Sequence, residues 1–145
     1  MRTEKDVEAY LLRSSRRYRA VDSPEGHRRT FFVDSGAGKP PVAVLVDPPL
    51  VVLRAHIGDL AKPPGAGGPG ETALFRKLLE LNARQLVHAS YGLEDSHVVL
   101  SSALELENLD FNEIQATLDE IDVALAQQLS LLGEAAQGGL KTNLG

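Results

Sequence analysis

The sequence predicts an α+β protein in which helices pack on an antiparallel five-stranded sheet, in the element order α-β-β-β-α-β-β-α. Apolar residues spaced three and four apart predict long helices over residues 71–87 and 110–132. Short runs of β-forming residues are joined by links too short for a parallel crossover, which needs a dozen or more residues. We expect a single domain over residues 1–132 and a flexible C-terminal tail over residues 133–145, which are rich in Gly and Ala.

The composition argues against several classes of protein. The 145 residues include no Cys, which excludes disulfides and cysteine-based metal sites or nucleophiles. No apolar run approaches the ~18 residues that cross a bilayer, and the charged start MRTEKDVEAY lacks the apolar centre of a secretory signal. The formal net charge of −5 disfavours a nucleic-acid role, which would favour a basic face. We therefore expect a cytoplasmic protein without nucleic-acid or membrane partners.

The first element is expected to be a helix from Thr3 to about Ala20. Thr3 can serve as N-cap, and Asp6 three residues later gives an approximate capping box. The apolar stripe is thin, so this helix should pack on a surface rather than through the core. Its members are Val7, Leu11 and Tyr18, with Tyr10 beside them. The arginines near its end are interpreted as solvated charges matched to the helix dipole, with a patch for acidic partners or nucleic acid as the alternative.

Three short strands are expected next, over residues 30–34, 42–47 and 50–57. The turn residues Ser23–Gly26 precede them. In the third strand one face is apolar throughout, and the other begins apolar and ends polar. This pattern is typical of a sheet that is covered on one side and partly open on the other.

The helix over residues 71–87 carries more apolar surface than the usual single stripe. Such a helix must be covered on two sides, by the sheet and by either further core or a second subunit. We therefore expect a homodimer through this helix. The expected interface residues are Leu78, Leu79, Asn82 and Leu86. Asn82 lies among leucines and would need a hydrogen-bond partner if it were buried.

A hairpin over residues 88–93 and 96–106 and a final helix complete the predicted domain. Asp110 is expected to cap the final helix, with Glu113 three residues later, and Leu109 can contact Ile114 across the cap. Gly133 is expected to end this helix. The apolar positions of the helix repeat at three and four residues, with Gln128 as the exception.

The Gly-rich loop over residues 62–70 matches a dinucleotide-binding fingerprint by spacing, with Gly65, Gly67 and Gly70 between a strand and a helix. Two observations argue against that interpretation. Pro69 removes an N–H from a loop that would have to donate N–H groups to phosphate. The next strand also turns back in a hairpin instead of crossing over in parallel.

The other residues that could act in catalysis or bind a metal form no recognisable catalytic or metal site. The four histidines, His27, His56, His88 and His97, lack the spacing of metal ligands on one helix. The serines lie outside any nucleophile elbow. The carboxylates at residues 105–113 are explained by solvation at a strand end and by helix capping. We therefore expect no catalytic residue, no cofactor and no metal.

The element order, together with two stretches, resembles the type III secretion chaperone-like superfamily, especially the Tir-chaperone (CesT-type) family and its bacterial sensory-transduction-regulator relatives. The stretches are LFRKLLELNARQLVHASYGLED and VVLSSALELENLDFNEIQATLDEI. The matching positions are Leu78-Leu79-x-Leu81-Asn82, Tyr91-Gly92-Leu93, Val98-Val99-Leu100 and Leu104-x-Leu106-x-Asn108-Leu109-Asp110. These motifs are apolar and structural, and the loops at residues 34–39 and 62–70 have no counterpart in the family pattern.

The resemblance implies a non-enzymatic, often dimeric protein that holds an extended segment of an effector-like client on apolar patches or at a sheet edge. The expected partner-binding residues are Tyr10, Leu11, Phe31, Phe32 and Val33. Two alternatives remain: a regulatory or adaptor domain of the same fold without secretion clients, and a nucleotide-binding enzyme that uses the Gly65–Gly70 loop.

Overall fold

The computed structural model describes residues 1–26, 28–136 and 140–142. The helices are α1 (Glu4–Arg13), α2 (Gly68–Arg84) and α3 (Phe111–Ala136). The strands are β1 (Tyr18–Asp22), β2 (Arg29–Val33), β3 (Val42–Asp47), β4 (Leu50–Leu60), β5 (Ser90–Glu94), β6 (His97–Glu105) and β7 (Leu140–Thr142). All pairings are antiparallel, in the order β1-β2-β3-β4-β6-β5, and β7 pairs with the far end of β4.

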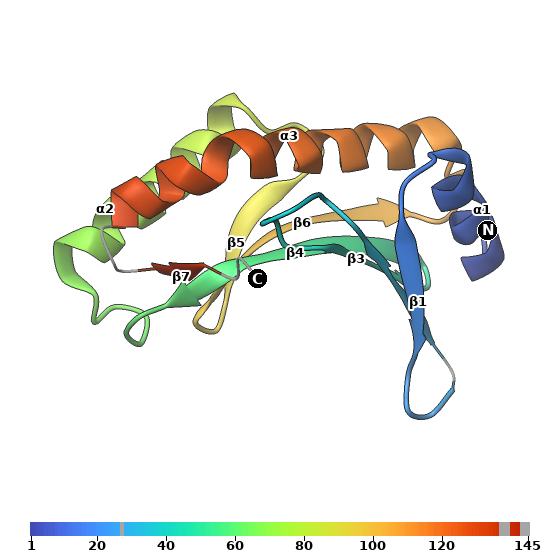
Figure 1. The fold of residues 1–145 in the computed structure, drawn as a ribbon, viewed down its shortest axis with the longest axis horizontal. Coiled ribbons are helices and arrows are strands. Elements are labelled where there is room, and N and C mark those ends of the chain that lie inside the picture. The colour runs from blue at the N-terminus through green and yellow to red at the C-terminus, as the bar shows by residue number, and fades with distance from the viewer. Residues whose placement is uncertain (27, 137–139, 143–145) are drawn as a thin grey trace.

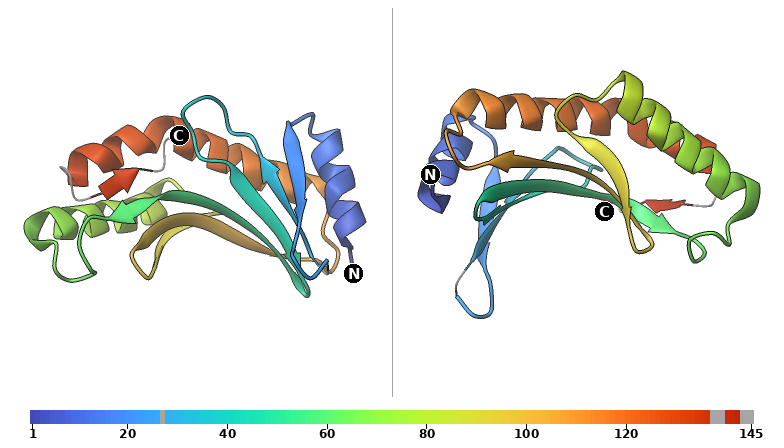
Figure 2. Two further views of the ribbon diagram at one scale, coloured as in Figure 1. Left: turned by 60° about the horizontal axis from the view of Figure 1, so that its bottom comes forward. Right: turned by 180° about the vertical axis from the view of Figure 1, so that it is seen from behind.

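The helices cover one face of this sheet. α3 runs along the length of the face with α2 beside it, and α1 lies at the β1 end (Figure 1). The two turned views show no helix across the opposite face in the part of the chain that the structure describes (Figure 2). The molecule therefore has two layers, and one sheet face is open, as the sequence pattern of β4 predicted.

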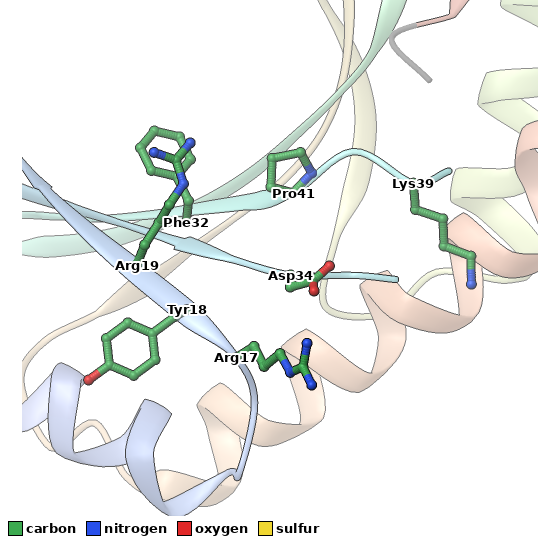
Figure 3. A pocket seen from close by; sticks show the side chains of 7 residues that line it. All are labelled: Arg17, Tyr18, Arg19, Phe32, Asp34, Lys39 and Pro41. Atoms are coloured by element: carbon green, nitrogen blue, oxygen red, sulfur yellow. The ribbon is translucent and has the colours of Figure 1, made fainter. Parts of the chain in front are cut away.

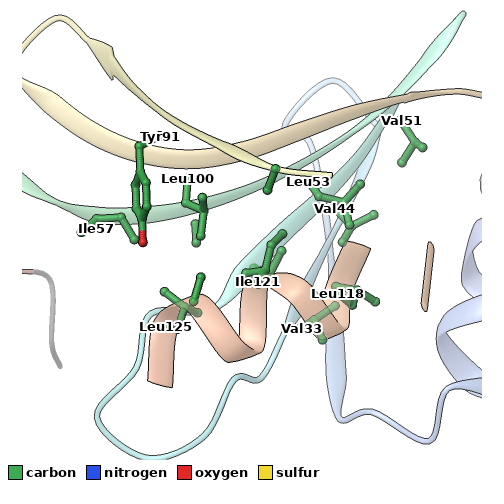
Figure 4. Close-up of a cluster of buried hydrophobic side chains, with 14 of the residues drawn as sticks. Val33, Val44, Val51, Leu53, Ile57, Tyr91, Leu100, Leu118, Ile121 and Leu125 are labelled. Atoms are coloured by element: carbon green, nitrogen blue, oxygen red, sulfur yellow. The ribbon is translucent and has the colours of Figure 1, made fainter. Parts of the chain in front are cut away.

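The core lies between the sheet and α3. The β4 residues Val51, Leu53, Ala55 and Ile57 are all fully buried. Figure 4 shows Leu53 and Ile57 on the sheet side of this cluster and Leu118, Ile121 and Leu125 of α3 on the other side, and Val51 and Ala55 belong to the same cluster. Alternate residues of a strand face opposite sides, so the intervening β4 residues lie on the open face.

The first helix is shorter than predicted: residues 14–17 form a turn and a short link, and β1 begins at Tyr18. The capping box between Thr3 and Asp6 is present, but α1 ends at Arg13, and Ser15 adopts a positive φ of 59°. The Arg16 side chain, 14% exposed, then reaches the carboxylates of Asp119 and Asp122 on α3. These contacts take the chain away from the α1 axis and into β1, which pairs with β2.

The sheet has six strands on its main path, and the prediction of five is wrong because it omitted β1. The eleven residues of β4 also extend three positions beyond the predicted strand. β6 pairs with β4 from Leu50 to Asp59 through a register that shifts between His56 and Gly58. β3 begins and ends at the predicted residues.

The helix ends also differ from the prediction. α3 passes through Gly133, its predicted end, and continues to Ala136. The cap is confirmed, since the Glu113 N–H donates to Oδ1 of Asp110 at 2.9 Å. β7 lies within the segment predicted as a tail, while residues 137–139 and 143–145 lie outside the described residues.

No helix in the described part combines the length and the apolar character needed to span a bilayer.

Candidate functional site

The open sheet face carries a continuous line of mostly apolar side chains. Cross-strand pairing places Val21, Thr30, Leu45, Val52 and Ala103 side by side across β1, β2, β3, β4 and β6. We call these five residues the apolar row. Val21 is 41% exposed, and every residue of the row is at least partly exposed. The row is therefore a partly exposed, mostly apolar surface that begins at the outermost strand.

β1 has a free edge next to this row. Asp34 N–H donates to the Arg17 carbonyl, and Ser23 N–H donates to the Arg28 carbonyl, at the two ends of the β1–β2 pair. Residues of an antiparallel pair alternate between hydrogen-bonded and non-hydrogen-bonded positions. Arg17 and Ser23 occupy hydrogen-bonded positions, and Ala20 is an odd number of residues from both. The N–H and carbonyl of Ala20 therefore point away from β2. Tyr18 and Asp22 have the same orientation, and β1 pairs with no strand but β2 among the described residues.

The opposite edge of the sheet, on β5, is partly closed by the chain itself. The Asn82 side chain donates to the Tyr91 carbonyl at 3.0 Å and accepts from the Tyr91 N–H at 2.7 Å. These two bonds occupy backbone groups that an added strand would need. They also give Asn82 the partner that its position among leucines required. Of the two edges on the main path, β1 is thus the accessible one.

A hollow at the start of β1 adds positive charge to this edge. Its lining residues are Arg17, Tyr18, Arg19, Phe32, Asp34, Lys39 and Pro41 (Figure 3). Three of them are cationic and one is acidic, in a chain whose formal net charge is −5. The Arg19 guanidinium lies 4.8 Å from the centre of the Phe32 ring. The hollow therefore suits an acidic group on a bound segment.

The structure separates the residues predicted to bind a partner. Leu11 and Phe31 are fully buried and Val33 is 1% exposed, so all three belong to the core. Phe32 faces the open side because it alternates with Phe31 and Val33 along β2. Tyr10 is half-buried, and its hydroxyl donates to the Leu109 carbonyl at 3.1 Å. A partner would reach Phe32 and part of Tyr10.

The residues predicted to form a dimer interface also lie in different environments. Leu78 is 5% exposed and lies in the core, whereas Leu79 is 68% exposed. Leu86 is half-buried against the core, and Asn82 is held by Tyr91. Leu79 lines a shallow hollow along the outer side of α2, together with Phe75 and Ala83.

The Gly-rich loop is occupied by a side chain of its own helix. The Glu71 carboxylate accepts hydrogen bonds from Gly65 N–H at 2.7 Å and from Gly67 N–H at 3.2 Å. A Cβ added at Gly67 would lie 2.7 Å from the Glu71 Cβ, so glycine is required for this close approach. These N–H groups are the ones that a phosphate would use, which argues against the nucleotide alternative.

Two features of the site were missed from the sequence. The first is β1, although the Ser23–Gly26 turn between YRAVD and RTFFV is a hairpin signal. The second is a cluster of His56, Asp59 and His97, which no spacing along the chain could reveal. Hydrogen bonds from His97 and His56 hold the pKa of Asp59 below its ordinary value, and the bond to Asp59 raises that of His97.

Comparison with known proteins gives one family and two informative folds. The CesT_Tir_1 family model matches residues 1–137. No curated protein sequence matches the chain. A chain of the heterodimeric ExoU–SpcU complex from the type III secretion system of Pseudomonas aeruginosa is 14% identical, with a TM-score of 0.62, over 88% of this chain and 98% of that chain.

The second fold is that of YbjN, a putative transcription regulator from E. coli. It is 12% identical, with a TM-score of 0.59, over 98% of this chain and 97% of that chain. At these identities the likeness concerns the fold, and the two names point to different uses of it.

Proposed function

Because the chain belongs to the CesT_Tir_1 family, we propose that it is a non-enzymatic, chaperone-like module that binds a partner protein by strand addition at β1. The observation that carries this proposal is the free β1 edge beside the apolar row. An added strand would pair with the outward backbone groups of Tyr18, Ala20 and Asp22, which gives affinity that does not depend on sequence.

The side chains of the added strand would supply the specificity. Those on one side of the strand would continue the apolar row beyond Val21, since pairing places side chains of neighbouring strands next to each other. An acidic residue near the start of β1 would meet the hollow lined by Arg17, Arg19 and Lys39. The preferred partner is therefore an extended segment with alternating apolar residues and at least one Asp or Glu.

Ala20→Pro is expected to weaken partner binding at least tenfold, because proline removes the outward N–H of residue 20 without touching a β1–β2 hydrogen bond. The probe is a peptide of about 15 residues selected on the chain by phage display, and fluorescence anisotropy measures its Kd. Hydrogen exchange should show protection of the Tyr18, Ala20 and Asp22 amides when the peptide is bound.

Two variants control this measurement. Ala20→Val keeps the N–H and should bind like the unmodified chain. Leu93→Pro places the same change at the other edge, on an outward position of β5, and should leave the Kd unchanged. Equal binding by Ala20→Pro and Ala20→Val would contradict strand addition at β1.

A regulatory or adaptor role is the alternative, and the fold of YbjN favours it. The two roles differ in the state of the bound partner. A chaperone-like module should co-purify with a protein whose bound segment is extended and cleaved by protease once released. An adaptor should retain a folded partner that stays resistant to protease after release.

We also propose that the protein forms a homodimer through the outer side of α2. Leu79→Asp should convert the dimer to a monomer of 15.6 kDa in light scattering at micromolar concentration. Its melting temperature should change little, because this side chain is 68% exposed. Leu78→Asp is the matched control: it places a charge in the core and should unfold the chain. A monomeric unmodified chain would contradict the proposal.

A further inference from the structure

The far half of β4 brings together three potential metal ligands from distant parts of the sequence. His56 and Asp59 lie on β4, and His97 is the first residue of β6. Asp59 and His97 are direct cross-strand partners. In a regular strand, residues three apart face opposite sides, but the register shift between His56 and Gly58 places His56 and Asp59 on the same side.

The ligand atoms converge on one point. His56 Nε2 lies 2.8 Å from Asp59 Oδ1, and His97 Nδ1 contacts the same oxygen. The two imidazole rings are 5.1 Å apart at an angle of 88°. One ligand atom from each of the three residues lies within 4.8 Å of the others. A cation can therefore be reached by two nitrogens and one oxygen with small side-chain rotations.

We propose that His56, Asp59 and His97 form a binding site for a divalent transition-metal ion of the Zn²⁺ class. Imidazole nitrogen suits Zn²⁺, Cu²⁺ and Ni²⁺, whereas Mg²⁺ and Ca²⁺ prefer sites built from oxygen. Three protein ligands leave one tetrahedral position for water. Imidazole binds such an ion in its neutral form, so the ion replaces any proton that a ligating nitrogen carries.

The surroundings favour a cation at this position. Asp95 and Glu94 lie close enough to act electrostatically on His97, and the Glu94 carboxylate is also paired with the Arg54 guanidinium at 3.0 Å. The side chains of His56, Asp59 and His97 are 37%, 46% and 48% exposed, so an ion enters from solvent without any opening of the fold. A bound ion would join β4 to β6 at the bulge, next to the segment of β4 that pairs with β7.

Titration of the full, tag-free chain with Zn²⁺ in a calorimeter tests this proposal. We expect one equivalent of Zn²⁺ with a Kd in the micromolar range and a rise in the melting temperature, since the fold is what brings the three ligands together and the ion therefore binds the folded state more tightly. His97→Ala and His56→Ala should each weaken binding at least tenfold. His88→Ala is the matched control, because it removes an exposed histidine that is not part of the cluster, and its Kd should not change.

Circular dichroism confirms that each variant is folded, as expected for half-exposed side chains. An unmodified chain that binds no Zn²⁺ at 100-fold excess would overturn the proposal. Binding that is equal in the unmodified chain and in a His56→Ala, His97→Ala double variant would overturn it as well. Neither result bears on strand addition at β1, so the two proposals fail independently.

Discussion

Phe31→Ala is expected to lower the free energy of unfolding by about 3–5 kcal/mol, the usual cost of removing a buried aromatic side chain. Phe31 is fully buried, and its ring meets that of Tyr18 edge-on with centres 5.8 Å apart. The loss combines transfer of the ring from water with the cavity that remains. Natural domains have about 5–15 kcal/mol of total stability, so a large part of it would be lost. Urea denaturation followed by circular dichroism measures the change.

Phe32→Ala is the matched control for this prediction. It removes the same side chain one residue later, from the open face, where the ring lies under the Arg19 guanidinium. We expect a change in the free energy of unfolding of less than about 1 kcal/mol, typical of exposed positions with a cation–π contact. Phe32→Ala should instead weaken binding of the selected peptide. Equal destabilisation by the two changes would contradict the assignment of their faces.

Glu120→Gln is expected to destabilise the chain by about 1.5–3 kcal/mol at pH 7, the range for hydrogen bonds to a charged group. The Glu120 carboxylate on α3 accepts bonds from Val87 N–H at 3.0 Å and from His88 and Ala89 N–H, both at 2.9 Å. These bonds fix the link between α2 and β5 to α3. All three bonds end on Oε1, and His88 N–H also lies 3.1 Å from Oε2. Glutamine can keep an oxygen at the Oε1 position, but it loses the negative charge and turns an N–H₂ group toward the His88 N–H.

The pH dependence of this effect has a definite sign. Burial raises the pKa of Glu120, but the three backbone hydrogen bonds outweigh it and hold the pKa below the ordinary value of 4.5. The carboxylate therefore contributes its full stability above pH 4.5, and this contribution is lost as the pH falls through the lower folded-state pKa. The difference between the unmodified chain and Glu120→Gln should narrow in that range.

Urea denaturation from pH 7 to pH 3 measures this difference. Glu105→Gln is the control, since Glu105 is exposed and its carboxylate accepts no hydrogen bond among the described residues. This control should follow the unmodified chain at every pH. A constant gap between the unmodified chain and Glu120→Gln across the whole range would contradict the assigned role of the carboxylate.

Elements with strong local signals were predicted well. The start of α3 was fixed by Asp110 and by the apolar repeat that follows it, and the cap bond is present. β3 needed only its β-branched run and the prolines on either side. Gln128, the exception in the apolar repeat, is buried because its side chain accepts a hydrogen bond from the Tyr91 hydroxyl at 2.6 Å. Tyr91 lies 37 residues from Gln128 in the chain, so the apolar repeat of the helix alone cannot predict this contact.

The burial of the residues predicted to bind a partner was predicted less well, for a physical reason. Phe31, Phe32 and Val33 were grouped by their apolar character, although period-two alternation sends Phe32 to the opposite face. β1 carried no such alternation, since four of its five residues are exposed. Its strand conformation depends on pairing with β2, which is a property of the fold rather than of the segment.

The sequence by itself determined the α+β class, the antiparallel pairing of strands joined by short links, the covered face of β4 and the family resemblance, because hydrophobic periodicity, capping and short links are local features. The tertiary structure decided which edge is free, which side chains of β2 and α2 remain exposed, and that His56, Asp59 and His97 meet. Each of these depends on pairing between distant segments or on a one-residue bulge. A one-residue shift in the pairing register moves a side chain to the opposite face of the sheet. The sequence pattern of a single segment does not show such a shift.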